Sequence, residues 1–160
     1  MAAPDRTFLG PNNTIAMRVS PGVVVQVFTG KVSREHLDAS LHMLDHPIVG
    51  VPYVQLCRVS PTSVKELPDD EFRARAAESL KARAGKLVGF AYVVAGEGFL
   101  ASMARAVITG INVVLRPTHP EKVFSEPLAA ANWLATHLPE GAFVPEQIVR
   151  DVDELVALTH

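Results

Sequence analysis

Short runs of apolar residues alternate along this chain with segments of helical periodicity. The apolar runs are rich in β-branched and aromatic residues, which favour strands, whereas the segments between them repeat an apolar side chain every three or four residues. The clearest example is Leu87–Ala95, an almost continuous apolar run that is followed by Gly96-Glu97-Gly98 and a helix-like Phe99–Thr109. Because such a run is typical of a strand buried on both faces, the pattern predicts an α/β fold.

The apolar runs predict five strands. The first two form a β-hairpin, because Pro21-Gly22 lies between two β-rich runs and bends the chain. The five predicted strands are Ile15–Val19, Val23–Phe28, Val51–Val59, Leu87–Ala95 and Ile111–Leu115.

Helical periodicity predicts five helices. One begins near Ser33, a suitable N-cap, and ends at Pro47. A second predicted helix begins near Pro68, with acidic residues in its first turn and basic residues further on, which suits the helix dipole. The remaining predicted helices are Phe99–Thr109, Pro127–Leu138 and Pro145–Leu158. The last of these has one apolar face, which requires cover either from its own sheet or from another chain.

A chain of 160 residues fits one domain with a substantial core. Residues 1–13 contain Pro4, Gly10, Pro11 and an Asn pair, and are predicted to be a flexible N-terminal segment. Residues 14–138 are predicted to form the α/β domain. Residues 139–160 are then a C-terminal helical extension.

Composition narrows the function classes. A formal net charge of −2 gives no overall basic field for nucleic acid or anionic lipid. No apolar segment approaches the roughly 18 residues that span a bilayer, and the N-terminus lacks the pattern of a signal peptide. We therefore expect a cytoplasmic protein without nucleic-acid binding or integral membrane association. The single cysteine, Cys57, lies in an apolar run and is expected to be buried.

Two local motifs resemble a known superfamily. Thr29-Gly30-Lys31-Val32-Ser33 follows the second strand, and Val123-Phe124 leads into a helix that contains Trp133-Leu134. Together with the order of elements, these motifs resemble the STAS superfamily, and most closely its SpoIIAA-like branch of uncharacterised bacterial proteins. The resemblance implies a mixed sheet of four or five strands with helices packed mainly on one face, no cofactor, and a role in protein–protein signalling or small-molecule sensing.

The resemblance also points to one loop. Anti-sigma-factor antagonists of the superfamily carry a phosphorylatable Ser or Thr after the third strand, where this chain has Ser60, Thr62 and Ser63. The chain departs from the family pattern, because Cys57-Arg58-Val59 precedes the loop and no glycine follows it. A phosphate here would find basic residues nearby in sequence. These candidate contacts for an anion or a partner are Arg58, Lys65, Arg73 and Arg75. The alternative is that Ser-Pro-Thr-Ser is only a turn that caps the next segment.

Other motifs favour structural roles. Gly96-Glu97-Gly98 lacks the third glycine of a dinucleotide loop, and Glu97 would repel phosphate. His42 and His46 have the spacing of metal ligands, but their place at a helix end favours a dipole interaction. No Gly-x-Ser-x-Gly elbow is present. We therefore assign no catalytic, cofactor-binding or metal-binding residue.

The resemblance to the STAS superfamily thus implies a non-catalytic bacterial regulatory or protein-interaction module with an unidentified protein partner. A symmetric homodimer is also predicted, through the C-terminal helix or a sheet edge. The alternative hypothesis is a domain that binds an apolar or acidic small molecule. A weaker alternative is an enzyme that uses Ser60, Thr62 or Cys57.

Overall fold

A computed structural model of the chain describes residues 6–10, 14–29, 35, 38–39, 52–61, 70–94, 96–115 and 118–159. Its centre is a six-stranded sheet whose strands lie in sequence order. The strands are β1 (Arg6–Leu9), β2 (Ile15–Ser20), β3 (Val23–Phe28), β4 (Tyr53–Val59), β5 (Leu87–Val94) and β6 (Glu121–Phe124). The predicted α/β class and mixed sheet are therefore confirmed.

The sheet changes from antiparallel to parallel at β3. Strands β1, β2 and β3 pair antiparallel, and β3 to β6 pair parallel. The predicted hairpin is present, with Ser20 opposite Val23 and a two-residue connection. Pro21 fixes a negative φ and Gly22 has a φ of 79°, a combination found in type II turns.

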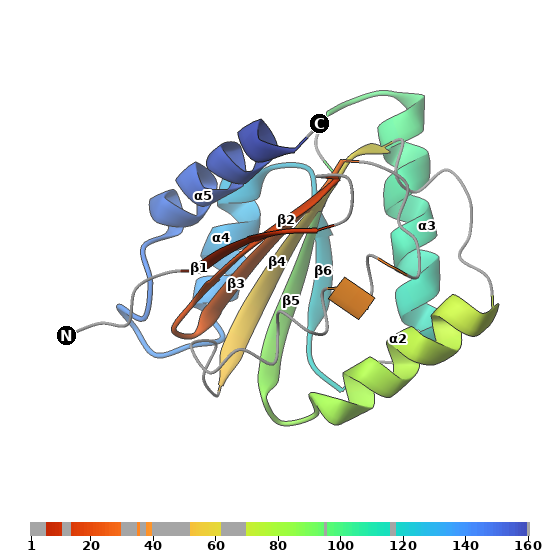
Figure 1. Ribbon diagram of the computed structural model, residues 1–160, viewed down its shortest axis with the longest axis horizontal. Coiled ribbons are helices and arrows are strands. Elements are labelled where there is room, and N and C mark those ends of the chain that lie inside the picture. Colours follow the sequence, from red (N-terminus) through yellow and green to blue (C-terminus); the bar gives the residue numbers. More distant parts are fainter. Residues whose placement is uncertain are drawn as a thin grey trace.

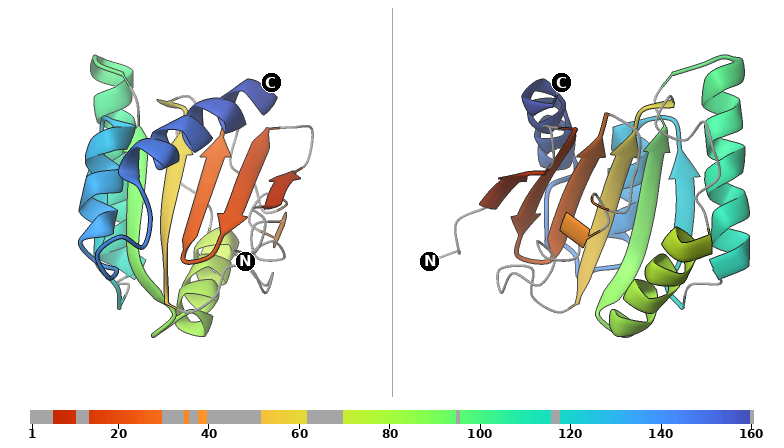
Figure 2. Two further views of the ribbon diagram at one scale, coloured as in Figure 1. Left: turned by 90° about the vertical axis from the view of Figure 1, so that its left-hand side faces the viewer. Right: turned by 45° about the vertical axis from the view of Figure 1, so that its right-hand side comes forward.

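Helices cover both faces of the sheet (Figures 1 and 2). Helices α4 (Pro127–Ala135) and α5 (Pro145–Leu158) pack on one side, and α2 (Asp70–Ala82) and α3 (Phe99–Leu115) lie on the other. This corrects the expectation that helices pack mainly on one face. The reason is that β3, β4 and β5 are apolar at nearly every position, so both of their faces require cover.

The core consists of two clusters, one on each face. On β3, Val23, Val25 and Val27 join α4 and α5, whereas Val24 and Phe28 point to the opposite side. This second side, which we call the α3 face, also receives Ala101, Ala104 and Ile108 from α3. Alternation along each strand thus assigns every sheet side chain to a defined environment.

Two further expectations were wrong. The sheet has six strands rather than four or five, because Arg6–Leu9 pairs with β2 inside the segment expected to be flexible. Its neighbouring Gly and Pro residues concealed a short edge strand. Ile111–Leu115, predicted as a strand, is the last part of α3. Its β-branched residues favour a strand locally, but the helix continues through Gly110, and the last strand is Glu121–Phe124.

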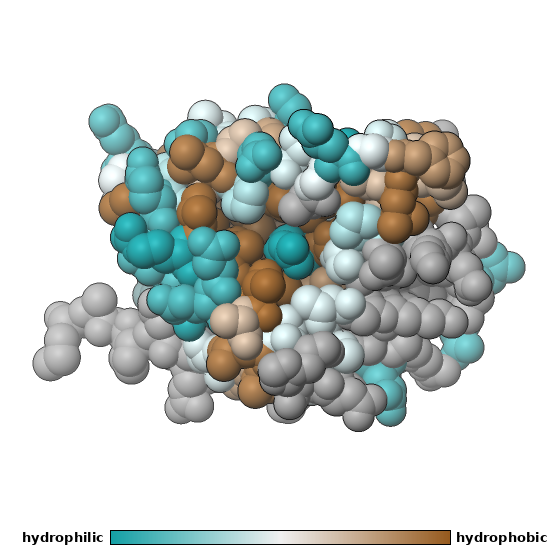
Figure 3. Space-filling view, turned by 90° about the horizontal axis from the view of Figure 1, so that it is seen from above, coloured by the Kyte–Doolittle hydropathy of each residue, from teal (hydrophilic) through white to brown (hydrophobic). Residues whose placement is uncertain are grey.

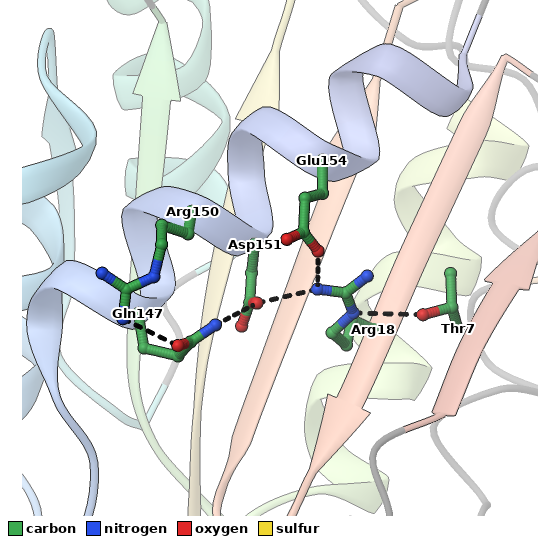
Figure 4. A network of polar contacts seen from close by, with 6 residues as sticks. All are labelled: Thr7, Arg18, Gln147, Arg150, Asp151 and Glu154. Atoms are coloured by element: carbon green, nitrogen blue, oxygen red, sulfur yellow. Dashed lines mark hydrogen bonds and ion pairs between the residues drawn. The ribbon is translucent and has the colours of Figure 1, made fainter.

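The C-terminal helix docks on its own sheet. Ile148, Val152 and Leu155 of α5 are buried in the core cluster beneath α4 and α5. A polar network between β2 and the same helix also holds it on the sheet (Figure 4). The Arg18 guanidinium on β2 donates to Asp151 at 2.8 Å and to Glu154 at 2.6 Å, and its Nε donates to Thr7 of β1 at 3.1 Å. Arg18 therefore ties the edge of the sheet to α5.

We predict that Arg18→Met lowers the free energy of unfolding by about 3 kcal/mol, because it leaves a buried carboxylate without its cation. Asp151 is 5% exposed and Arg18 is 15% exposed, so water replaces little of the lost interaction. Glu154→Gln is the control, since that carboxylate is 57% exposed and should cost less than about 1 kcal/mol. Urea unfolding measures both. Equal losses for the two variants would contradict a buried ion pair.

Candidate functional site

The predicted phospho-acceptor loop is described only at its start. Ser60 follows β4, is half-buried, and its amide donates to the carbonyl of Phe28 at 3.1 Å. Thr62, Ser63 and Lys65 lie outside the described residues. The role of this loop as a phospho-acceptor or partner site therefore stays a prediction.

Of the four predicted basic contacts, the structure describes the side chains of Arg58 and Arg75, and these two lie on opposite faces of the sheet. Arg58 lies on the same face as α4 and α5, where burial lowers its pKa and Asp153 of α5 opposes that effect. Arg75 belongs to α2 on the other side of the sheet, where its guanidinium pairs with Asp38. Arg73 also lies in α2, but its side chain is outside the described part. One phosphate cannot contact both Arg58 and Arg75.

Cys57 is buried in the core, as the sequence predicts. Burial raises the pKa of its thiol far above the usual value, so the thiolate needed for nucleophilic chemistry is disfavoured. Among the described residues, no group of three or more His, Cys, Asp or Glu side chains is placed to hold a metal ion. His42 and His46 lie outside that part of the chain.

The Gly96-Glu97-Gly98 turn joins β5 to α3 and uses its glycines for backbone shape. Gly96 and Gly98 have φ values of 101° and 95°, which other residues rarely adopt. Arg105 reaches back from α3 and donates to the carbonyls of Val94 and Gly96. The only charged side chain of α3 is thus occupied at the end of β5.

Helix α3 exposes an uncharged surface. Ala101, Ala104 and Ile108 face the sheet, and the opposite side of the helix is open to solvent. Phe99 is 81% exposed, Val113 68% and Met103 43%. We call this solvent-facing surface the α3 stripe. It consists of Phe99, Ser102, Met103, Ala106, Thr109, Gly110 and Val113.

The α3 stripe is unusual for a surface helix, because none of its seven residues carries a charge. Thr109 uses its hydroxyl within the helix, donating to the carbonyl of Arg105 at 2.9 Å. Seen from above in Figure 3, apolar side chains gather over the beginning of α3, where Phe99, Leu100 and Met103 are exposed. Such a surface is typical of contact with another protein.

A second unusual feature lies inside the molecule, on the α3 face. Polar side chains cross this apolar face from β3 to β6, and we call Gln26, Gln55, Tyr92 and Glu121 the polar band. Gln55 Nε2 donates to Gln26 Oε1 at 3.0 Å, and Arg83 donates to Gln55 Oε1 at 3.3 Å. The register continues the band, because Gln26 and Tyr92 flank Cys57, and Gln55 and Glu121 flank Phe90.

The far end of the polar band contains a buried carboxylate. Glu121 Oε1 lies 2.8 Å from His119 Nε2, and these side chains are only 5% and 3% exposed. Glu121 Oε2 is buried and has no hydrogen-bond partner. Beside them, Tyr92 stacks on Phe90 with ring centroids 4.5 Å apart. Burial raises the pKa of Tyr92 well above its usual value, and the nearby Glu121 carboxylate raises it further, so the phenol stays neutral.

Sequence analysis missed both features. Gln26 and Gln55 interrupt apolar strands, which is a signal of a polar group on a buried face. His119 and Glu121 stand outside any predicted element, and only the strand register places them beside Phe90 and Tyr92. The α3 stripe could have been predicted from the sequence, because most of the helix contains no charged residue.

Comparison of the chain with models of known protein families, with curated proteins and with solved structures finds no match. The resemblance to the STAS superfamily therefore stays a prediction. In the part of the chain that the structure describes, no helix combines the length and apolarity needed to cross a bilayer.

We predict that Cys57 resists thiol reagents in the native protein and reacts only on unfolding. Because its folded pKa is raised, its contribution to stability is present below the unfolded pKa and is lost as pH rises above it. The free energy of unfolding should fall by up to about 1.4 kcal/mol per pH unit above roughly pH 8.5. Cys57→Ala should reduce that slope in urea titrations between neutral and alkaline pH. Rapid labelling of the native thiol would contradict the assignment.

Proposed function

We propose that this chain is a non-catalytic protein-interaction module of regulatory type, that the α3 stripe is its contact surface, and that a second copy of the chain is a partner. The observation that carries the proposal is the exposed, uncharged side of α3. Apolar side chains at its two ends, Phe99 and Val113, are left in water unless a partner covers them. The buried, high-pKa Cys57 also supports a role without thiol catalysis.

The stripe is complementary to itself. Ser102, Ala106 and Gly110 repeat a small residue every four positions, which lets a second helix approach closely. In an antiparallel pair with a two-fold axis at Ala106, Phe99 meets Val113 of the other copy and Met103 meets Thr109. Large side chains then lie at the periphery and small ones at the centre. With no charge on either surface, the pairing meets no repulsion.

The size of the stripe sets the expected affinity. A helix of 17 residues is about 25 Å long, and one exposed face of it covers less than the roughly 800 Å² per partner of a standard stable interface. We therefore expect a reversible dimer with a dissociation constant in the micromolar range. Such weak contacts are typical of regulatory assemblies that exchange partners.

We predict that Ala106→Glu shifts the monomer–dimer equilibrium at least about tenfold toward monomer, because two like charges would face each other at the axis. Ala129→Glu is the matched control, since Ala129 is an exposed alanine of α4, outside the stripe. Sedimentation velocity across the micromolar range measures both. A wild-type chain that stays monomeric at several hundred micromolar, or an Ala129→Glu variant as impaired as Ala106→Glu, would overturn the proposal.

A further inference from the structure

Only one of the two oxygens of the buried Glu121 carboxylate has a hydrogen-bond partner. An ionised carboxylate accepts at both oxygens, and burial without a partner is costly because water is no longer available. Oε1 has His119, whereas Oε2 has no partner. Within the described residues, no Arg or Lys forms an ion pair with Glu121. Although Oε2 is buried, the described residues supply no donor for it, so this acceptor is left for a donor from outside them.

The surroundings define what that donor is. Phe90, Tyr92 and His119 present ring systems next to the carboxylate, with the Phe90 and His119 centroids 6.3 Å apart. Ring faces attract cations and accept flat apolar groups. The Tyr92 side chain is only partly buried, and its hydroxyl makes no hydrogen bond within the described part of the chain. It is therefore available to a ligand as donor or acceptor.

We propose that Glu121, with His119 and Tyr92, forms a binding site for a small ligand that carries a protonated amine on a flat apolar body. The ammonium group donates to Glu121 Oε2, and the apolar body lies against the Phe90 and Tyr92 rings. An anionic ligand is disfavoured, because its charge would face the Glu121 carboxylate. A metal ion is disfavoured too, since the described residues supply no set of three ligating carboxylate, imidazole or thiol side chains there.

This inference is independent of the α3 stripe. Glu121 lies on β6 and its side chain is directed to the sheet's α3 face, whereas the stripe is on the opposite, solvent-facing side of α3. It also differs from the ligand expected from the sequence, which was apolar or acidic. The buried carboxylate is the reason for the change.

The test uses the whole 160-residue chain, with benzylammonium as the probe. Binding is measured by calorimetric titration and by the changes in the amide chemical shifts of β5 and β6. Saturable binding in the millimolar range is expected, with the largest shifts near Tyr92 and Glu121. Glu121→Gln should weaken binding at least about tenfold, because it replaces a charged acceptor. Glu140→Gln, the same change at an exposed position, should leave binding unchanged.

Benzoate is the probe of opposite charge and should not bind. Tyr92→Phe keeps the ring and removes the hydroxyl, so about threefold weaker binding is expected, and this variant decides the matter if Glu121→Gln does not fold. The proposal is wrong if benzylammonium shows no saturable binding to wild type. It is equally wrong if benzoate binds as well as benzylammonium, or if Glu121→Gln folds and binds like wild type.

Discussion

Burial of the central sheet on both faces is the constraint on which the rest of this structure depends. Strands β3, β4 and β5 supply apolar side chains to two separate cores. A polar atom that is buried on either face without a hydrogen-bond partner therefore lowers the stability of the fold. Arg18 meets this demand through Asp151 and Glu154, and the Gln26–Gln55 pair meets it on the other side. Glu121 meets it only in part, because its Oε2 is one of the buried side-chain atoms that have no hydrogen-bond partner.

The helices of the two faces satisfy the same constraint in opposite ways. Helix α5 buries Ile148, Val152 and Leu155 and presents carboxylates and one arginine to water or to Arg18, as an amphipathic helix that belongs to one chain should. Helix α3 buries Ala101, Ala104 and Ile108 but keeps apolar residues outside as well. The sequence offered the C-terminal helix or a sheet edge as a dimer contact, and that helix is covered by its own sheet. Among the described residues, exposed apolar side chains gather on α3, which leaves its outer surface without cover.

The sequence correctly predicted those helices and strands that are specified by residues close together in the chain. Pro21-Gly22 defines the first hairpin, the continuous run before Gly96 defines β5, and the apolar spacing after Pro145 defines α5. Ile111–Leu115 was misassigned because β-branched residues indicate a strand over a short window, whereas helix formation there depends on the preceding turns. The polar band was not predictable, because Gln26, Gln55 and Glu121 are brought together only by strand register. Two of the predicted basic contacts, Arg58 and Arg75, are separated for a related reason, because alternation places Arg58 on the face opposite α2.

Disulfide cross-linking at the proposed two-fold axis tests the central claim most directly. In an antiparallel α3 pair, position 106 of one copy faces position 106 of the other, close enough for a disulfide to form. The buried thiol of Cys57 should not compete under native conditions. An Ala106→Cys chain oxidised at micromolar concentration should form a covalent dimer much faster than an Ala129→Cys chain, whose cysteine lies outside the stripe. Equal rates for the two variants would contradict the α3 stripe as the contact surface.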